Sequence, residues 1–148
     1  MTESTNLRLL DLLAATAQDL LDGVPADACS VSRVIGDVLI LVTERAPEGR
    51  TLLLGQGYLV PDYPVTQTVL SSGMPYAMTL SDENVDQAEA SVLDELGFAS
   101  LLMLPITIGG STWGLVEIYR ILPVAFDADA IRIAGEIVAR ASKRADSG

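Results

Sequence analysis

Two apolar segments that meet at Gly109-Gly110 constrain the fold of this chain more than any other feature. Residues 97–120 read GFASLLMLPITIGGSTWGLVEIYR, and nearly every position before the glycine pair is apolar. Glycine accepts the positive φ of a two-residue hairpin turn, so the stretch predicts two antiparallel strands. A first strand that is apolar on both sides indicates a central position in a sheet with both faces covered.

The turn length also predicts which side chains share a face, because a two-residue turn sets the parity of the pairing. Leu102 should then lie opposite Glu117. One face would carry Ser100, Leu102, Leu104, Ile106, Trp113, Leu115, Glu117 and Tyr119, and the other Leu101, Met103, Gly114, Val116 and Ile118. The second face is wholly apolar, and Gly114 would let a helix approach it. The mixed first face has the character of a small-molecule pocket wall.

The remaining pattern predicts a single domain over residues 1–148, of the α/β class in its α+β form. Apolar residues spaced by three and four predict a helix over 5–22. Strands are expected at 28–35, 38–44 and 51–54, with 55–64 mainly loop, and a short strand at Tyr76–Thr79. Short helices are expected at 65–72 and 87–96. Asp127 or Asp129 should cap a final helix over about 128–144, and the sheet with its inserted helices would span 28–120.

Both terminal helices carry more apolar residues than one packed face requires. The first has leucines at 7, 9, 10, 12, 13, 20 and 21, and the second has Ile131, Ile133, Ala134, Ile137 and Val138. An exposed apolar patch beyond a few hundred Å² is uncommon on a monomer. We therefore expect a homodimer that forms through helices 5–22 and 127–144.

The charge balance and the single cysteine restrict location and partners. The chain has 20 acidic and 9 basic residues, a net charge of −11, so clustered cations for a phosphate backbone or an anionic membrane are missing. No nucleic acid and no membrane are expected as partners. One cysteine, Cys29, rules out an internal disulfide and fits a reducing compartment. With no signal-peptide pattern at the N-terminus, the expected location is cytoplasmic.

The C-terminal half resembles a GAF domain. The run LGFASLLMLPITIGGSTWGLVEIYR, followed by FDADAIRIAGEIVARAS, is similar to the family pattern of a serine, an apolar strand, a glycine turn, Gly-Leu-Val-Glu, and an acidic cap before a helix. YPVTQTVLSSGMPYAM is similar to the family's middle segment. The resemblance implies a central antiparallel sheet of five or six strands. Terminal helices would lie on one face, and short helices and loops would close a pocket on the other.

The resemblance also implies a regulatory role rather than catalysis. Some GAF domains reduce methionine sulfoxide with several cysteines, and others bind haem through histidine, but this chain has one cysteine and no histidine. Cys29 does not resemble a bilin attachment site, and the cyclic-nucleotide signature cannot be placed. The sequence therefore predicts no enzyme, no metal site and no cofactor, with haem and a covalent bilin both disfavoured.

Glu117 is the candidate of most interest for a pocket. It is either a satisfied carboxylate, bonded to loop backbone or to Arg120, or a ligand contact whose pKa is raised by partial burial. The other candidate pocket residues are Ser100, Leu102, Tyr119, Tyr76, Met78 and Tyr63, and ordinary packing is the alternative for Tyr76 and Met78.

Three functions remain open on these grounds. The first is a non-enzymatic sensor that binds an unidentified small molecule and signals through its terminal helices. The second is a protein-interaction module with a filled pocket and an acidic docking face, and the third is an unrecognised enzyme. An open cavity would favour sensing, and a filled one would favour docking to a protein partner.

Overall fold

A six-stranded antiparallel sheet in the order β3-β2-β1-β6-β5-β4 forms the centre of the molecule. The computed structural model describes the backbone of residues 2–52 and 55–147, with side chains from residue 8 onward. The elements are α1 (Thr2–Gly23), β1 (Ala28–Ile35), β2 (Val38–Arg45), β3 (Gly57–Leu59), η1 (Val60–Asp62), α2 (Pro64–Ser72), β4 (Tyr76–Thr79), α3 (Gln87–Glu95), β5 (Ser100–Ile108), β6 (Ser111–Arg120) and α4 (Ala128–Ser147). The expected α+β fold with a five- or six-stranded sheet is confirmed.

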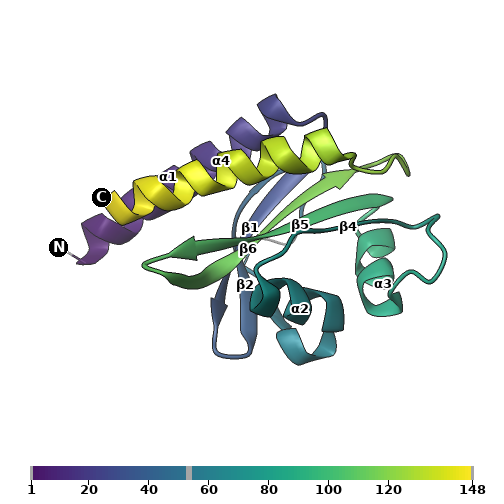
Figure 1. The fold of residues 1–148 in the computed structure, drawn as a ribbon, viewed down its shortest axis with the longest axis horizontal. Helices are drawn as coiled ribbons and strands as arrows, with labels where there is room; N and C mark the ends of the chain where they lie inside the picture. The colour runs from purple at the N-terminus through teal and green to yellow at the C-terminus, as the bar shows by residue number, and fades with distance from the viewer. Residues whose placement is uncertain (1, 53–54, 148) are drawn as a thin grey trace.

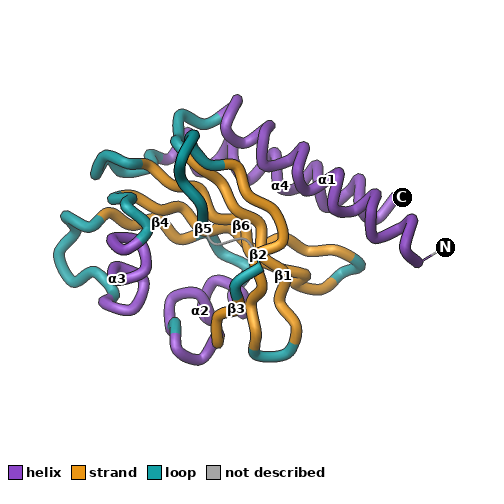
Figure 2. The backbone as a smooth tube through the Cα atoms, turned by 180° about the vertical axis from the view of Figure 1, so that it is seen from behind, coloured by secondary structure: helices purple, strands orange, loops and turns teal. Residues whose placement is uncertain are grey.

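Helices cover both faces of this sheet (Figure 1). The long helices α1 and α4 lie side by side on one face, and both chain termini are at the same end of the pair. The short helices α2 and α3 lie on the opposite face, as the view from behind also shows (Figure 2). We call these the helix face and the cavity face of the sheet.

Local sequence signals explain where the short helices and α4 begin and end. The Asp86 carboxylate accepts a hydrogen bond from the Glu89 N–H and caps α3. Asp127 Oδ1 accepts from the Ala130 N–H at 2.8 Å, which confirms the expected cap of α4. Gly73 follows α2 with a φ of 75°, a left-handed conformation that glycine adopts without strain.

The third strand does not lie where the sequence pattern placed it. Residues 51 and 52 are not in a strand, and positions 53 and 54 of the expected 51–54 strand lie outside the described residues. Instead β3 forms at Gly57–Leu59 and pairs with β2, within a segment expected to be loop. The glycines of this segment favour turns, so its sequence predicts a loop. A strand forms because the segment can pair with the open edge of β2.

A β-bulge changes the register of the β5–β6 hairpin. Gly109 and Gly110 both have positive φ, and Ile108 faces Ser111, as the two-residue turn predicts. Thr107 then pairs with Thr112 but Ile106 pairs with Gly114, so Trp113 is an extra residue on β6. A bulge of this kind shifts every later pair by one position.

The expected division of the hairpin into faces is therefore wrong beyond the bulge. Met103, not Leu102, lies opposite Glu117, and Leu102 lies opposite Ile118. Leu102 belongs to the cluster on the helix face, whereas Met103 belongs to the cluster on the cavity face. The length of a turn predicts which side chains share a face only if neither strand contains an inserted residue.

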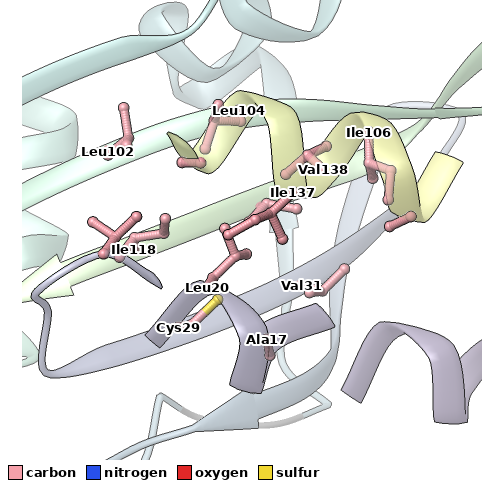
Figure 3. Close-up of a cluster of buried hydrophobic side chains, with 14 of the residues drawn as sticks. Ala17, Leu20, Cys29, Val31, Leu102, Leu104, Ile106, Ile118, Ile137 and Val138 are labelled. Atoms are coloured by element: carbon pink, nitrogen blue, oxygen red, sulfur yellow. The ribbon is translucent and has the colours of Figure 1, made fainter. Parts of the chain in front are cut away.

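The core on the helix face joins the sheet to α1 and α4 (Figure 3). Leu13, Ala17 and Leu20 of α1 are fully buried there, together with Cys29 and Ile118 from the strands. Each fully buried leucine or isoleucine contributes roughly 1.5–3 kcal/mol relative to an exposed one. This cluster therefore holds both terminal helices firmly on β1, β5 and β6.

Candidate functional site

A cavity opens on the cavity face, between the sheet, the segment 58–66 and α3. It is lined by Ser32, Leu39, Leu41, Leu52, Tyr58, Val60, Tyr63, Thr66, Glu89, Val92, Leu96, Glu117 and Tyr119. The cavity itself has a volume of about 40 Å³, and the space around it is about 490 Å³ when the crevices between side chains and the open mouth are included. The cavity is therefore narrow, with room for about three waters.

Glu117 projects from β6 into this cavity. The side chain is partly exposed, and that surface borders the cavity. Burial raises the pKa of the Glu117 carboxyl to about 8, and the Glu89 carboxylate adds to the rise, whereas a hydrogen bond from Tyr119 opposes it. This carboxyl therefore keeps its proton to a higher pH than a solvated glutamate does.

Glu89 brings a second carboxylate to the same cavity from the first turn of α3. It is only 5% exposed, and its Oε1 accepts a hydrogen bond from the Thr66 hydroxyl of α2. Burial raises the pKa of Glu89, the Thr66 bond opposes this, and Asp86 adds to the rise. Two carboxylates from different elements thus meet across one narrow space.

Three tyrosines complete the polar part of the cavity. Tyr119 is buried on β6, and its hydroxyl lies 3.3 Å from Ser30 Oγ. Tyr58 and Tyr63 are half-buried and pack edge to face, with ring centroids 5.8 Å apart. Burial raises the pKa of all three phenols, so they stay neutral hydrogen-bond donors.

The structure places the seven expected pocket residues in several different environments. Glu117, Tyr119 and Tyr63 line the cavity. Leu102 lies on the helix face, and Ser100 is buried where its hydroxyl donates to the Leu122 carbonyl at 3.1 Å. Both were assigned to the cavity face by the wrong hairpin parity.

Two of these expected pocket residues lie near α2 or in the core beside the cavity. Met78 is buried in the core of the cavity face, outside the lining itself. Tyr76 borders a separate outer groove with Pro64, Met74 and Pro75. Neither side chain is part of the cavity wall.

Arg120 does not serve Glu117 as a counter-ion. Its Nε donates to the Pro25 carbonyl at 2.8 Å, and its Nη1 donates to the Val124 and Ala125 carbonyls. The guanidinium also lies 4.0 Å from the centre of the Phe126 ring. Arg120 therefore ties the β6–α4 loop to the end of α1, away from the cavity.

Glu89 was not among the residues expected from the sequence, although a helical pattern could have found it. Glu89, Val92 and Leu96 are spaced by three and four residues, so one side of a helix over 87–96 presents a carboxylate beside two apolar residues. All three line the cavity. Tyr58 gave no such signal, because its strand is too short to show a pattern.

The chain belongs to the GAF domain family, because its family model matches residues 8–144. GAF domains are generally sensory or regulatory domains rather than enzymes, and this chain shares that general class. Nothing matches among curated protein sequences.

Solved structures with the same fold include GAF domains from cyanobacterial proteins and from a sensor histidine kinase. The blue-light absorbing form of the PixJ GAF domain of Thermosynechococcus elongatus has a TM-score of 0.85 at 17% identity, over 97% of this chain and 88% of that one. A phycocyanobilin-bound GAF domain from a cyanobacterial phytochrome has a TM-score of 0.82 at 17% identity, and the match covers 98% of this chain and 91% of that one. The GAF domain of a two-component sensor histidine kinase from Bacillus halodurans has a TM-score of 0.76 at 17% identity, and the match covers 93% of this chain and 92% of that one.

These similarities overturn one expectation from the sequence. No cofactor was expected, with haem and a covalent bilin disfavoured, yet similar structures include a phycocyanobilin-bound domain. The argument against a bilin relied on the context of Cys29, and it bears only on a covalent bond through that thiol. The expectation of no cofactor is therefore wrong as a reading of this fold, since the same fold holds a bilin in that domain.

The described part of the chain contains neither a cluster of side chains that could hold a metal ion nor a helix that could span a membrane. Among the side chains of residues 8–52 and 55–147, no three His, Cys, Asp or Glu residues lie together as a metal site would require. No helix in the same residues is both long and apolar enough to span a bilayer.

Proposed function

We propose that this GAF domain is a sensor that binds a small molecule in the cavity and transmits its occupancy to α1 and α4. The observation that carries the proposal is the placement of Glu117 in β6. Its side chain enters the cavity, whereas its neighbours Val116 and Ile118 are buried against the helix-face core. A ligand that moves this part of β6 would therefore disturb the packing of the terminal helices.

The lining explains what kind of ligand the cavity could accept. Apolar side chains from β2 and α3 supply the walls, and the carboxylates and tyrosines supply a few convergent polar groups, as in most small-molecule sites. An outer vestibule adjoins the cavity. Both are bordered by the same four residues, Tyr58, Tyr63, Val92 and Leu96. A ligand longer than the cavity would extend into this vestibule.

The residues present fit a bilin only if it is held without a covalent bond to the chain's cysteine. Cys29 lies among the helix-face side chains (Figure 3). The cavity is on the opposite side of the sheet. A bilin is much larger than the few waters for which the cavity has room, so most of it would lie in the outer vestibule beside Tyr58 and Tyr63. Arg50 borders that vestibule and could pair with a carboxylate of the bilin. A bilin would supply absorption of visible light.

A blocked cavity tests the proposed function. We expect a panel that includes biliverdin to contain at least one compound that raises the melting temperature of the native protein. Val92→Trp places a large ring at the boundary of cavity and vestibule and should abolish that shift, because the space would be filled. Val124→Trp, at an exposed loop, is the matched control and should retain the shift.

Two results would count against the sensor proposal. Either no compound in the panel shifts the wild-type protein, or the shift persists in Val92→Trp. Native mass spectrometry of the purified protein adds a second measurement, because a co-purifying molecule should be retained by the control and lost from Val92→Trp.

We also propose that the domain acts as a homodimer through α1 and α4. Leu10 on α1 is 40% exposed, and Leu9, Leu12 and Ile133 remain half-buried on the paired helices. Burial of this surface against a second copy would typically cover about 1,200–2,000 Å² in total. The side chain of Leu7 lies outside the described residues.

The dimer proposal has a simple test. Leu10→Glu should shift sedimentation equilibrium from twice the chain mass toward the monomer mass of 15.6 kDa, because a charge would enter the interface. Leu122→Glu changes an exposed leucine on the β6–α4 loop and should leave the dimer intact. Leu13 is unsuitable because it is fully buried within the protomer. A monomer mass for the wild-type chain at high micromolar concentration would refute the dimer.

A further inference from the structure

The cavity contains two carboxylates and no basic side chain among its described lining residues. Glu117 enters from β6 and Glu89 from α3, and burial makes a negative charge unfavourable at both. The rest of the lining is apolar, phenolic or hydroxyl-bearing. A carboxylate pair in such surroundings gains most from a positive charge placed between its members.

The aromatic residues at the cavity favour the same kind of occupant. Tyr58 and Tyr63 meet edge to face beside the vestibule, and Tyr119 lies beside Glu117 on β6. Aromatic faces attract cations, and ammonium groups are bound in this way when they are removed from water. The rings and the apolar walls also suit an organic body better than a small, strongly hydrated metal ion.

The charged groups around the cavity add to its negative character, with one exception. Asp86 acts on Glu89 from the start of α3, and Glu95 borders the vestibule from the end of the same helix. Arg50 also borders the vestibule, but its Nη1 donates to the Gly97 carbonyl and its guanidinium lies 5.3 Å from the centre of the Phe98 ring. Arg50 is thus held at the rim rather than between the two carboxylates.

We propose that the cavity selects an organic cation, such as a substituted ammonium, whose charge lies between Glu117 and Glu89 and whose apolar part contacts Tyr58 and Tyr63. This inference rests on the proposed function, since it names the class of ligand for the same cavity. Binding of a fixed positive charge favours the ionised form of Glu117. Affinity should therefore rise with pH, and protons should be released on binding.

Three probes of nearly the same shape separate charge from fit. Choline carries a permanent positive charge, 3,3-dimethylbutan-1-ol is its neutral counterpart, and 3,3-dimethylbutanoate is an anion. Titrations followed by proton NMR should give choline at least ~10-fold tighter binding than the alcohol at about pH 8.5, with the anion weakest. Val92→Trp should abolish binding of all three, which locates them in the cavity.

Glu117→Gln is the decisive variant, because it removes one charge and keeps the shape. Choline affinity should fall ~10-fold or more, whereas affinity for the alcohol should change by less than about twofold. For the wild-type protein, choline affinity should increase roughly tenfold or more from about pH 6.5 to 9, since Glu117 has a pKa of about 8, and Glu117→Gln should flatten this profile. Glu83→Gln, which removes an exposed carboxylate, is the matched control and should behave as wild type.

The outcomes distinguish this inference from the proposed function. If the alcohol or the anion binds as tightly as choline, and Val92→Trp still abolishes binding, the cation preference is wrong and the sensor proposal stands. The cation preference is equally wrong if choline fails to bind while a neutral or anionic panel compound fills the cavity. If no compound binds at all, both proposals fall.

Discussion

Gly114→Ala should destabilise the domain by more than about 4 kcal/mol, enough to leave much of it unfolded. A Cβ at this position would lie 1.9 Å from the Ser32 carbonyl oxygen and 3.2 Å from the Arg33 Cα. Both are backbone atoms of β1, so no side-chain rotation relieves the clash and two central strands must separate. Urea denaturation, or the soluble fraction if the variant does not fold, measures the effect.

Gly135→Ala is the matched control for this prediction. Gly135 lies in α4, and a Cβ there would meet nothing within 4 Å. Alanine at this helix position should stabilise the protein by about 0.5–1 kcal/mol, because glycine loses more backbone freedom on folding. A Gly114→Ala protein within about 1 kcal/mol of wild type would contradict the close approach of β1 and β6.

Glu117→Gln should change how stability depends on pH. The pKa of Glu117 is raised from 4.5 to about 8 in the folded state, so the folded protein holds a proton that the unfolded chain releases. The contribution of Glu117 to stability is therefore fully present below pH 4.5. It is lost as the pH rises from 4.5 to about 8. The total loss should be about 3 kcal/mol, less than the full shift implies, because water at the exposed edge of the side chain screens the charge. The glutamine variant should lack this loss.

Urea denaturation at about pH 5 and pH 9 measures this difference, with Glu83→Gln as the control. The fall in unfolding free energy between the two pH values should be smaller in Glu117→Gln than in wild type and in the control. The pKa of Glu89 is also raised, so Glu89 contributes to the fall in unfolding free energy in every one of these proteins. If the unfolding free energy fell by the same amount in wild type, Glu117→Gln and Glu83→Gln, Glu117 would titrate as an ordinary solvated carboxylate.

The sequence alone identified most elements, because their signals are local. The apolar spacing of α1 and α4, the Asp127 cap, the glycine turn at 109–110 and the alternation of β1 all depend on neighbouring residues. The resemblance to GAF domains added the arrangement of the layers, which the fold confirms. Glu117 was selected because a carboxylate within an apolar strand needs an explanation wherever it lies.

Only the tertiary structure decided which residues meet. The bulge at Trp113 reversed the faces of Leu102 and Met103, and no local pattern marks an inserted residue in a long strand. Glu89 reaches the cavity of Glu117 across more than twenty residues of sequence through the packing of α3 on the sheet. Gly114 was expected to admit a helix, but its missing side chain makes room for the backbone of β1. Each of these contacts depends on how separate elements pack, and periodicity within one element carries no information about that.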